Sequence, residues 1–373
     1  MTRSRWHYPR KEFADRVYAL LADGPVQGLS LFGPRRTGKT QFLTHDLAPL
    51  AESKGHRVVY ASLWQTLDTP LGILLYEFDR ALRAGSVWDR LTTAAGDIAP
   101  KFKVKAPGSP GEMEIDLSQL KGKAPESHLL LLDQYCERLA RGRKPAFLLF
   151  DEFQELARSK TAAPLIAALR TSLDKRKNGL VAVFTGSSRE GLRAMFSPRE
   201  APFFRFATPI DLPPMEDAFV DHQLAAFKAT SKAKVTRDAA LKIFHRFDRS
   251  PAFFQRWLTT MALHPEMSED AAIAKVQSEI AEEFGFGKRW LELNGIQRVT
   301  ARLLAEKVAQ IYSQQGADRI KALTGAPAPG SSAIQSAVQR LSRLGIADKW
   351  EGEWRLSDPL FEAWVLNRPE TDF

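Results

Sequence analysis

The feature that most constrains this chain is one short glycine-rich segment, Gly33-Pro34-Arg35-Arg36-Thr37-Gly38-Lys39-Thr40. The segment matches the pattern G-x-x-x-x-G-K-[ST] at every fixed position. It follows an apolar run and precedes an amphipathic helical stretch over residues 41–51. A strand, loop and helix in this order can direct backbone N–H groups and the positive end of a helix dipole at a phosphate. The segment therefore predicts an α/β fold with a phosphate-binding loop at residues 33–40.

The residue types in this loop predict ATP and Mg²⁺ as its ligands. Gly33 and Gly38 let the backbone close around the phosphates, and the Lys39 ammonium would reach the β- and γ-phosphates. The Thr40 hydroxyl would bind Mg²⁺. We expect Lys39 to act in catalysis as well as in binding. The loop residues expected to contact the nucleotide are Gly33, Pro34, Arg35, Arg36, Thr37, Gly38, Lys39 and Thr40.

A second apolar run, over residues 146–150, ends in two acids, Asp151 and Glu152. We expect Asp151 to hold Mg²⁺ through the shell of the cation, and Glu152 to polarise the attacking water. A third apolar run ends in Ser187 and Ser188. Their hydroxyls could orient the water or sense the γ-phosphate, although ordinary capping of the strand end explains them nearly as well.

The pattern of apolar runs predicts how the chain is divided. Short runs alternate with helical patterns up to Leu212, which is typical of βα units and a mainly parallel sheet. Helical patterns alone follow, and then three helical pieces and a hairpin in the order of a winged helix. We expect a nucleotide-binding core at 1–213, an α-helical lid at 214–287 and a C-terminal winged-helix domain at 288–373. The core strands are expected at residues 28–33, 57–64, 146–152, 180–188 and 207–212.

An inserted β-hairpin is predicted at about 101–117. The segments KFKVK and EMEIDL both alternate with period two, and proline and glycine residues lie between them. One face of the hairpin would be apolar and the other a ladder of opposite charges; a decorated surface loop is the alternative. Antiparallel pairing would set Lys105 opposite Glu112, Lys103 opposite Glu114 and Lys101 opposite Asp116.

Composition excludes several classes of protein. The 373-residue chain has 44% hydrophobic and 26% charged residues, close to ordinary globular usage. It shows neither an apolar run long enough to span a bilayer nor an apolar N-terminal leader, so we expect a cytoplasmic protein without membrane contact. The single cysteine, Cys136, cannot form an internal disulfide and lies in an amphipathic stretch, where packing is its expected role.

The net charge of +9 is compatible with nucleic acid as a partner. The excess is concentrated in residues 157–206, which carry ten lysines and arginines against three acids. Within this stretch Lys175, Arg176 and Lys177 form a basic run ahead of a strand. We expect this run to carry nucleic-acid contacts; a solvated charged loop is the alternative.

These motifs, in this order, resemble the AAA+/STAND ATPases, and most closely the archaeal-type ATPase group. The resemblance covers most of the chain and is most specific at the two ATP motifs, Walker A and Walker B. It implies that Arg205, in an aromatic and basic segment before the last core strand, is an arginine finger or a γ-phosphate sensor; exposed surface charge is the alternative. Such an arginine would complete the site of a neighbouring copy, so the resemblance also implies a homo-oligomer in the ATP state.

The resemblance is weaker in the helical lid. Family members commonly have a Gly-x-Pro turn near the adenine, and here the proline is kept as Pro251 while the glycine is lost. The departure argues against adenine contact by the lid. It leaves Arg249, at a helix start, as the candidate sensor arginine.

Two functions fit these observations. One is an Mg²⁺-dependent ATPase that couples its nucleotide state to the lid and the winged helix and acts on nucleic acid. The other is an ATP-gated switch or scaffold that hydrolyses slowly or not at all and binds a protein partner in signalling or defence. The expected recognition helix carries only two arginines, Arg340 and Arg343, so protein docking is as well supported as DNA binding.

Overall fold

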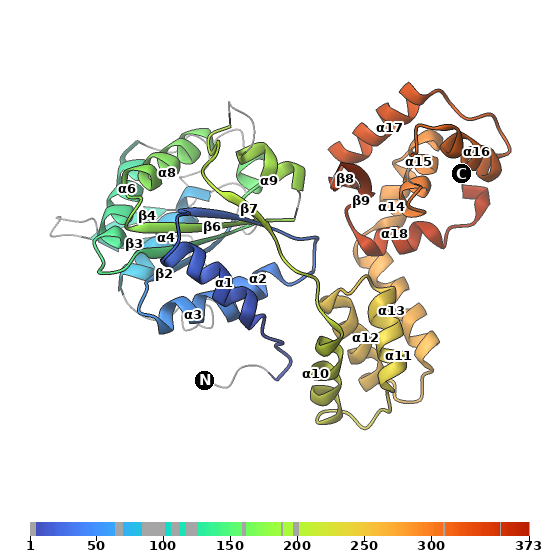
Figure 1. The fold of residues 1–373 in the computed structure, drawn as a ribbon, viewed down its shortest axis with the longest axis horizontal. Coiled ribbons are helices and arrows are strands. Elements are labelled where there is room, and N and C mark those ends of the chain that lie inside the picture. Colours follow the sequence, from blue (N-terminus) through green and yellow to red (C-terminus); the bar gives the residue numbers. More distant parts are fainter. Residues whose placement is uncertain are drawn as a thin grey trace. The chain divides into compact units, whose positions relative to one another are not determined.

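The computed structural model (Figure 1) describes residues 5–63, 70–83, 126–158, 162–187, 189–196, 201–308, 310–350 and 352–372, and the backbone of 101–105 and 112–116. The chain divides into two compact units. The first comprises Pro9–Gly33 and Gly38–Leu212; the second comprises Met1–Tyr8, Pro34–Thr37 and Pro213–Phe373. The middle of the predicted phosphate loop, residues 34–37, therefore belongs with the second unit.

A five-stranded parallel sheet forms the centre of the first unit. Its strands are β1 (Gly28–Phe32), β2 (Val58–Ser62), β5 (Ala146–Asp151), β6 (Leu180–Gly186) and β7 (Thr208–Asp211). They lie in the order β2-β5-β6-β1-β7, and every residue of β1, β5 and β6 is buried. Long apolar runs are expected of parallel strands covered on both faces. The predicted α/β fold with a mainly parallel sheet is confirmed.

Helices cover both faces of this sheet (Figure 1). On one face lie α1 (Lys11–Ala22), the π-helical η1 (Phe42–Leu47) and α3 (Ala48–Ser53); on the other lie α4 (Pro70–Arg83), α6 (Glu126–Ala140), α8 (Ala163–Lys175) and α9 (Arg189–Phe196). Alternate residues of β5 enter the two cores. Phe147 and Leu149 pack toward α1, whereas Leu148 and Phe150 pack toward α6, because side chains alternate along a strand.

The single cysteine lies in the second of these cores. Cys136, on α6, is fully buried and unbonded. Burial raises the pKa of its thiol to about 12, so the thiolate needed for nucleophilic chemistry does not form near neutral pH. The predicted packing role is confirmed.

The predicted hairpin is present with the predicted register. Strands β3 (Lys101–Lys105) and β4 (Glu112–Asp116) pair antiparallel, and β3 runs beside α4. A slip of one residue would move every side chain to the other face, so the alternation of apolar and charged residues, together with the length of the segment that joins the two strands, predicts the pairing. The paired residues include Lys105 with Glu112, Lys103 with Glu114 and Lys101 with Asp116. The turn at 106–111 lies outside the described residues.

The second unit begins with four helices: α10 (Asp217–Lys228), α11 (Arg237–Arg246), α12 (Pro251–Leu263) and α13 (Glu269–Glu283). Their sequence signals are local. Pro251 occupies the first turn of α12, where its missing N–H costs nothing, and the Ser268 side chain caps α13 by accepting from Ala271 N. Aromatic rings fill their core, with Phe254 in contact with Phe244 and Trp257.

At the end of the second unit, a short helix is followed by three helices and a hairpin, and these last four elements have the winged-helix order. The elements are α14 (Phe286–Leu291), α15 (Gly295–Ala305), α16 (Gln314–Thr324), α17 (Ser331–Arg343), β8 (Ala347–Trp350), β9 (Glu353–Leu356), α18 (Pro359–Leu366) and the 3-10 turn η3 (Glu370–Asp372). A capping box of Asn294 and Gln297 starts α15. Buried residues from Met215 to Val365 form one continuous core, and the proposed boundary between lid and winged helix at 287 stays a prediction.

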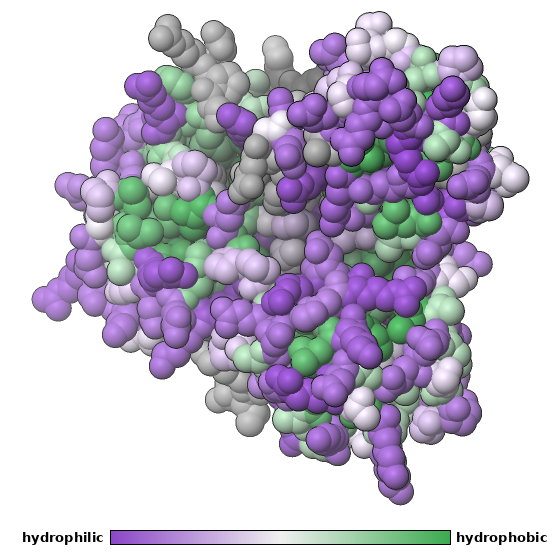
Figure 2. All heavy atoms as spheres, turned by 45° about the vertical axis from the view of Figure 1, so that its right-hand side comes forward, coloured by the Kyte–Doolittle hydropathy of each residue, from purple (hydrophilic) through white to green (hydrophobic). Residues whose placement is uncertain are grey.

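The face drawn in Figure 2 is mostly hydrophilic. In the view of Figure 2, polar and charged residues cover most of the face, with small separate apolar areas between them. Single exposed side chains such as Leu130, Leu263 and Leu291 are normal on a protein surface. Among the described helices there is none with the length and apolar character needed to cross a bilayer.

Candidate nucleotide-binding site

The glycine-rich loop joins β1 to α2 (Lys39–Gln41), which continues into η1 and α3. Gly38 has φ +95°, a left-handed conformation that glycine adopts at little cost, and its carbonyl accepts the first helical hydrogen bond from Phe42 N. The Lys39 residue is only 5% exposed, and its Nζ donates to Gly33 O over 2.8 Å. The ammonium thus lies inside the loop, beside its first glycine.

Asp151 meets the loop at the carboxyl end of the sheet. The Thr40 hydroxyl donates to Asp151 Oδ2 over 2.6 Å. The same oxygen accepts from the Tyr60 hydroxyl over 3.1 Å, and the Thr185 hydroxyl donates to Oδ1. Three donors from three different elements therefore hold this buried carboxylate beside the phosphate loop.

Tyr60 and Thr185 were not among the predicted site residues. Each is a hydroxyl-bearing residue in a mostly apolar strand, which is the only signal that the sequence offered. Burial, and then the charge of Asp151, raise the pKa of Tyr60, so its hydroxyl stays protonated and acts as a donor. Thr185 accepts from Glu152 N over 3.3 Å while donating to Asp151, so it contacts both acids.

Glu152 follows Asp151 in a left-handed conformation, with φ +54°, which is uncommon outside glycine. Its Oε2 accepts from Ser187 Oγ over 2.8 Å and from Ser187 N over 3.2 Å. The Gln154 amide donates to the same oxygen. Two of the predicted residues, Glu152 and Ser187, are thus brought together directly. Ser188 lies outside the described residues.

The middle of the loop makes contacts within the second unit. The Arg36 guanidinium carbon lies 3.4 Å from the centroid of the Phe284 ring and 4.9 Å from that of Phe253. Ser250 Oγ donates to Arg36 O over 3.3 Å. Burial lowers the pKa of Arg36, and its Nη1 is buried without a hydrogen-bond partner among the described residues. Arg35 is exposed, and the Thr37 hydroxyl closes the turn by donating to Pro34 O.

The two candidate sensor arginines lie in different surroundings. Arg205 is exposed and precedes β7, whose first residue pairs with Leu29 near the start of β1. Because the strands are parallel, Arg205 lies near the amino ends of the strands. The loop at 33–40 follows the carboxyl end of β1. Arg249 donates to Met215 O over 3.1 Å and pairs with Asp217 over 3.3 Å.

In the basic run at 175–177, one of the three cations is paired with an acid of the same unit. The Arg176 guanidinium binds Asp133 through two hydrogen bonds of 2.7 and 3.0 Å, and its side chain is 12% exposed. These bonds hold the pKa of Asp133 down at about 2. Lys175 Nζ is 4.0 Å from the same carboxylate. An acid from α6 therefore already pairs with Arg176, whereas Lys175 and Lys177 are exposed, and the nucleic-acid role of the run stays a prediction.

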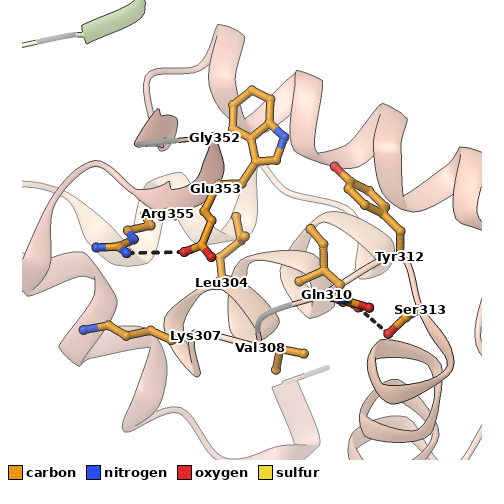
Figure 3. Close-up of a pocket in the computed structure, with 11 residues that line it drawn as sticks. Leu304, Lys307, Val308, Gln310, Tyr312, Ser313, Gly352, Glu353 and Arg355 are labelled. Atoms are coloured by element: carbon orange, nitrogen blue, oxygen red, sulfur yellow. Dashed lines mark hydrogen bonds and ion pairs between the residues drawn. The ribbon is translucent and has the colours of Figure 1, made fainter.

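A cavity of about 500 Å³ lies between the loop after α15 and the hairpin β8–β9. Figure 3 shows Arg355 paired with Glu353 on one side and Tyr312 on the other. Tyr312 also hydrogen-bonds Trp354, and Lys307 pairs with Glu362 over 3.3 Å. The two cations that line this cavity, Lys307 and Arg355, are each paired with an acid. The lining contains neither a glycine-rich loop before a helix nor acids at a strand end, the features expected around a nucleotide phosphate with a metal. The predicted ATP-binding residues at 33–40 lie outside this cavity.

Known structures share this architecture. Neither a protein-family model nor a curated protein matches the sequence. A Walker-type ATPase of Pyrococcus abyssi matches with a TM-score of 0.66 and 16% identity over 96% of this chain and 95% of that one. The ORC2 protein of Aeropyrum pernix in its ADP form matches with a TM-score of 0.56 and 16% identity over 95% and 93%. The chain shares the fold of these two proteins.

The same ORC2 protein in ADPNP-ADP complexes matches with a TM-score of 0.53 and 16% identity, over 96% of this chain and 95% of that one. All three matches cover at least 95% of this chain, so they extend into its C-terminal part and are consistent with a winged helix after the α/β core. The resemblance inferred from the ATP motifs is confirmed at the level of the fold.

Proposed function

We propose that this chain binds ATP with Mg²⁺ at residues 33–40 and hydrolyses the ATP. One contact carries the proposal, the 2.6 Å hydrogen bond from the Thr40 hydroxyl to Asp151 Oδ2. Thr40 opens the helix after β1, Asp151 ends β5, and β6 lies between these two strands. A hydroxyl and a carboxylate from separate strand ends therefore meet beside the phosphate loop, as a nucleotide-bound cation requires.

The donor set fits Mg²⁺. In nucleotide sites this cation takes oxygen ligands from phosphate, water and only one or two protein groups. Thr40 and Asp151 supply such oxygens. The described residues include no group of three or more His, Cys, Asp or Glu that could hold a metal by themselves, so binding would depend on the nucleotide. When bound, the cation would neutralise charge on the phosphates.

The two remaining roles fall to Lys39 and Glu152. The Lys39 ammonium, now on Gly33 O, would bind the phosphates and stabilise negative charge during transfer. Glu152 would accept a proton from water as the water oxygen attacks the γ-phosphorus. The bond from that phosphorus to the bridging oxygen would break, releasing ADP and phosphate.

Two variants test this proposal. Lys39→Ala should abolish ATP binding in calorimetry, because it removes the cation at the phosphates. Glu152→Gln keeps the shape of the side chain, so ATP binding should survive while phosphate release falls by about a hundredfold or more. Gln27→Met is the control, since Gln27 bonds Leu173 O and Leu180 O at the amino edge of the sheet.

The outcomes separate the two functions. A Lys39→Ala variant that binds ATP as well as wild type would disprove the site. Wild-type turnover in Glu152→Gln would leave hydrolysis without its base. If wild type and Glu152→Gln both bind ATP and neither releases phosphate, the result favours the alternative function, an ATP-gated switch that hydrolyses slowly or not at all.

The partner surface is proposed on the winged helix. On α17, Ile334, Val338 and Leu341 are buried, and the polar positions of the helix, including Arg340 and Arg343, are exposed. This exposed face supports contact with nucleic acid or with a protein. The two are distinguished by salt, since binding to phosphates weakens steeply as salt concentration rises.

A further inference from the structure

Gln154 occupies a confined position beside the proposed catalytic acid. It lies in the turn between β5 and α7 (Glu155–Arg158) and is 4% exposed. Its Nε2 donates to Glu152 Oε2 and, over 3.4 Å, to Glu155 Oε1. Only the NH₂ end of an amide can donate to two carboxylates, so these contacts determine which way the amide faces.

The other end of the amide lies against the end of β6. A Cβ built on Gly186 would stand 2.5 Å from Gln154 Oε1, closer than real atoms approach. The absence of a side chain at Gly186 therefore provides the space that the amide oxygen occupies. That oxygen is buried without a hydrogen-bond partner among the described residues. A buried unpaired acceptor is unfavourable, so the orientation must be stabilised by the two carboxylates at the other end.

We propose that Gln154 is the positioning residue for Glu152, and that Gly186 is a glycine because this amide needs its space. The proposal rests on the function proposed above, hydrolysis of ATP with Glu152 as the base. Ser187 N, Ser187 Oγ and Gln154 Nε2 all donate to Oε2 of Glu152. These three donors hold the Glu152 carboxylate through Oε2. The other oxygen, Oε1, is then the one that accepts the proton of water. Gln154 acts through Glu152 and does not itself touch the phosphates.

The first test removes the amide and keeps the length of the side chain. In Gln154→Met, kcat should fall by about tenfold, the effect of one hydrogen bond to a charged group that is needed in the transition state. Affinity for a non-hydrolysable ATP analogue, measured by calorimetry, should stay within about twofold, because the phosphate loop is untouched. Gln27→Met, a half-buried glutamine of the same unit, should leave both values unchanged.

The second test is a double-mutant cycle between positions 154 and 186. Gly186→Ala should lower kcat in the wild-type background, because the new methyl group displaces the amide. In a Gln154→Ala background the amide is gone and Leu192 Cβ, at 3.3 Å, is the remaining close neighbour, so Gly186→Ala should have a much smaller further effect on kcat. The melting temperature of the nucleotide-free protein should show the same coupling, and this reading does not depend on hydrolysis.

Each contrary result has a distinct meaning. An unchanged or raised kcat in Gln154→Met, with active wild-type enzyme, would overturn the positioning role and leave the proposed function intact. Additive effects of the two substitutions on kcat and melting temperature would overturn the link to Gly186. Wild-type protein that binds ATP without releasing phosphate would overturn both the positioning role and hydrolysis, and that failure is visible without any variant.

Discussion

At the scale of single residues, the site depends on hydroxyl groups that orient acids. Thr185 is fully buried and contacts Asp151 and the backbone of Glu152. A buried threonine hydroxyl needs hydrogen-bond partners. Thr185 lies on β6, and its two partners, the Asp151 carboxylate and Glu152 N, lie at the end of the neighbouring strand β5. Thr185 therefore sets the direction of the carboxylate that would serve the cation.

We expect Thr185→Val to weaken Mg²⁺-dependent ATP binding by about 10- to 100-fold, as the loss of a group that orients a metal ligand usually does. The substitution keeps the branched shape and removes the hydroxyl. Calorimetric titrations with ATP in Mg²⁺ and in EDTA would measure the effect, which should be much smaller without the cation. Thr171→Val is the control, because Thr171 bonds only within α8, to Ala167 O. Equal losses with and without Mg²⁺ would contradict the assignment of Thr185 to the carboxylate.

At the scale of elements, an ion pair joins α6 to the end of α8. Asp133, on α6, accepts from Ser172 Oγ and from both terminal nitrogens of Arg176. The bidentate geometry restricts both side chains, unlike the exposed pair of Glu137 and Arg141 on the same helix. The two helices cover the same face of the sheet and are linked there by charge as well as by packing.

This ion pair predicts a pH dependence of stability. The pKa of Asp133 is about 2 in the folded protein, below the unfolded value of about 3.9. Its contribution is therefore fully present above about pH 4 and is lost as the pH falls through 2. Asp133→Asn should lower the melting temperature by several degrees at pH 7, and the difference from wild type should vanish near pH 2. Glu137→Gln should have little effect at either pH. A constant difference across this range would show that charge is not the cause.

At the scale of the whole molecule, the position of Arg205 has a consequence for assembly. Arg205 lies near the amino ends of the strands, and the phosphate loop of the same chain lies at their carboxyl ends. The two are therefore separated by at least the length of β1, which has 5 residues and is about 16 Å long. An arginine finger at this position could serve only a second copy of the chain. The proposed finger therefore requires a homo-oligomer in the ATP state.

Mixing of variants tests this requirement. Arg205→Ala should lower phosphate release by about 10³-fold, the usual contribution of an arginine finger, and leave ATP binding by the isolated chain unchanged. Mixed with Glu152→Gln, it should regain activity, because one copy supplies the arginine and the other the base. Arg193→Ala provides a control for loss of an arginine in the same region. Failure of the mixture to recover, together with an unchanged rate in Arg205→Ala alone, would assign Arg205 to the surface.

Local sequence determined much of this protein. The phosphate loop depends on glycine at a left-handed position and on a lysine and a threonine at fixed spacing, and all of these are local in the chain. Each buried strand was recognisable from its own apolar run. The register of β3 with β4 followed from alternation and from the short segment that joins them, because a slip of one residue would reverse both faces.

Tertiary structure decided which side chains meet. Asp133 and Arg176 are 43 residues apart, and Tyr60 and Asp151 are 91 apart, so no pattern within one element could pair them. The same holds for Gln154 and Gly186, whose contact exists because β5 and β6 are neighbours. Motifs specify chemistry through backbone conformation and residue type, which are local properties. The partners of a charge or an amide depend on which elements pack together, and that is settled only when the sheet and its helices assemble.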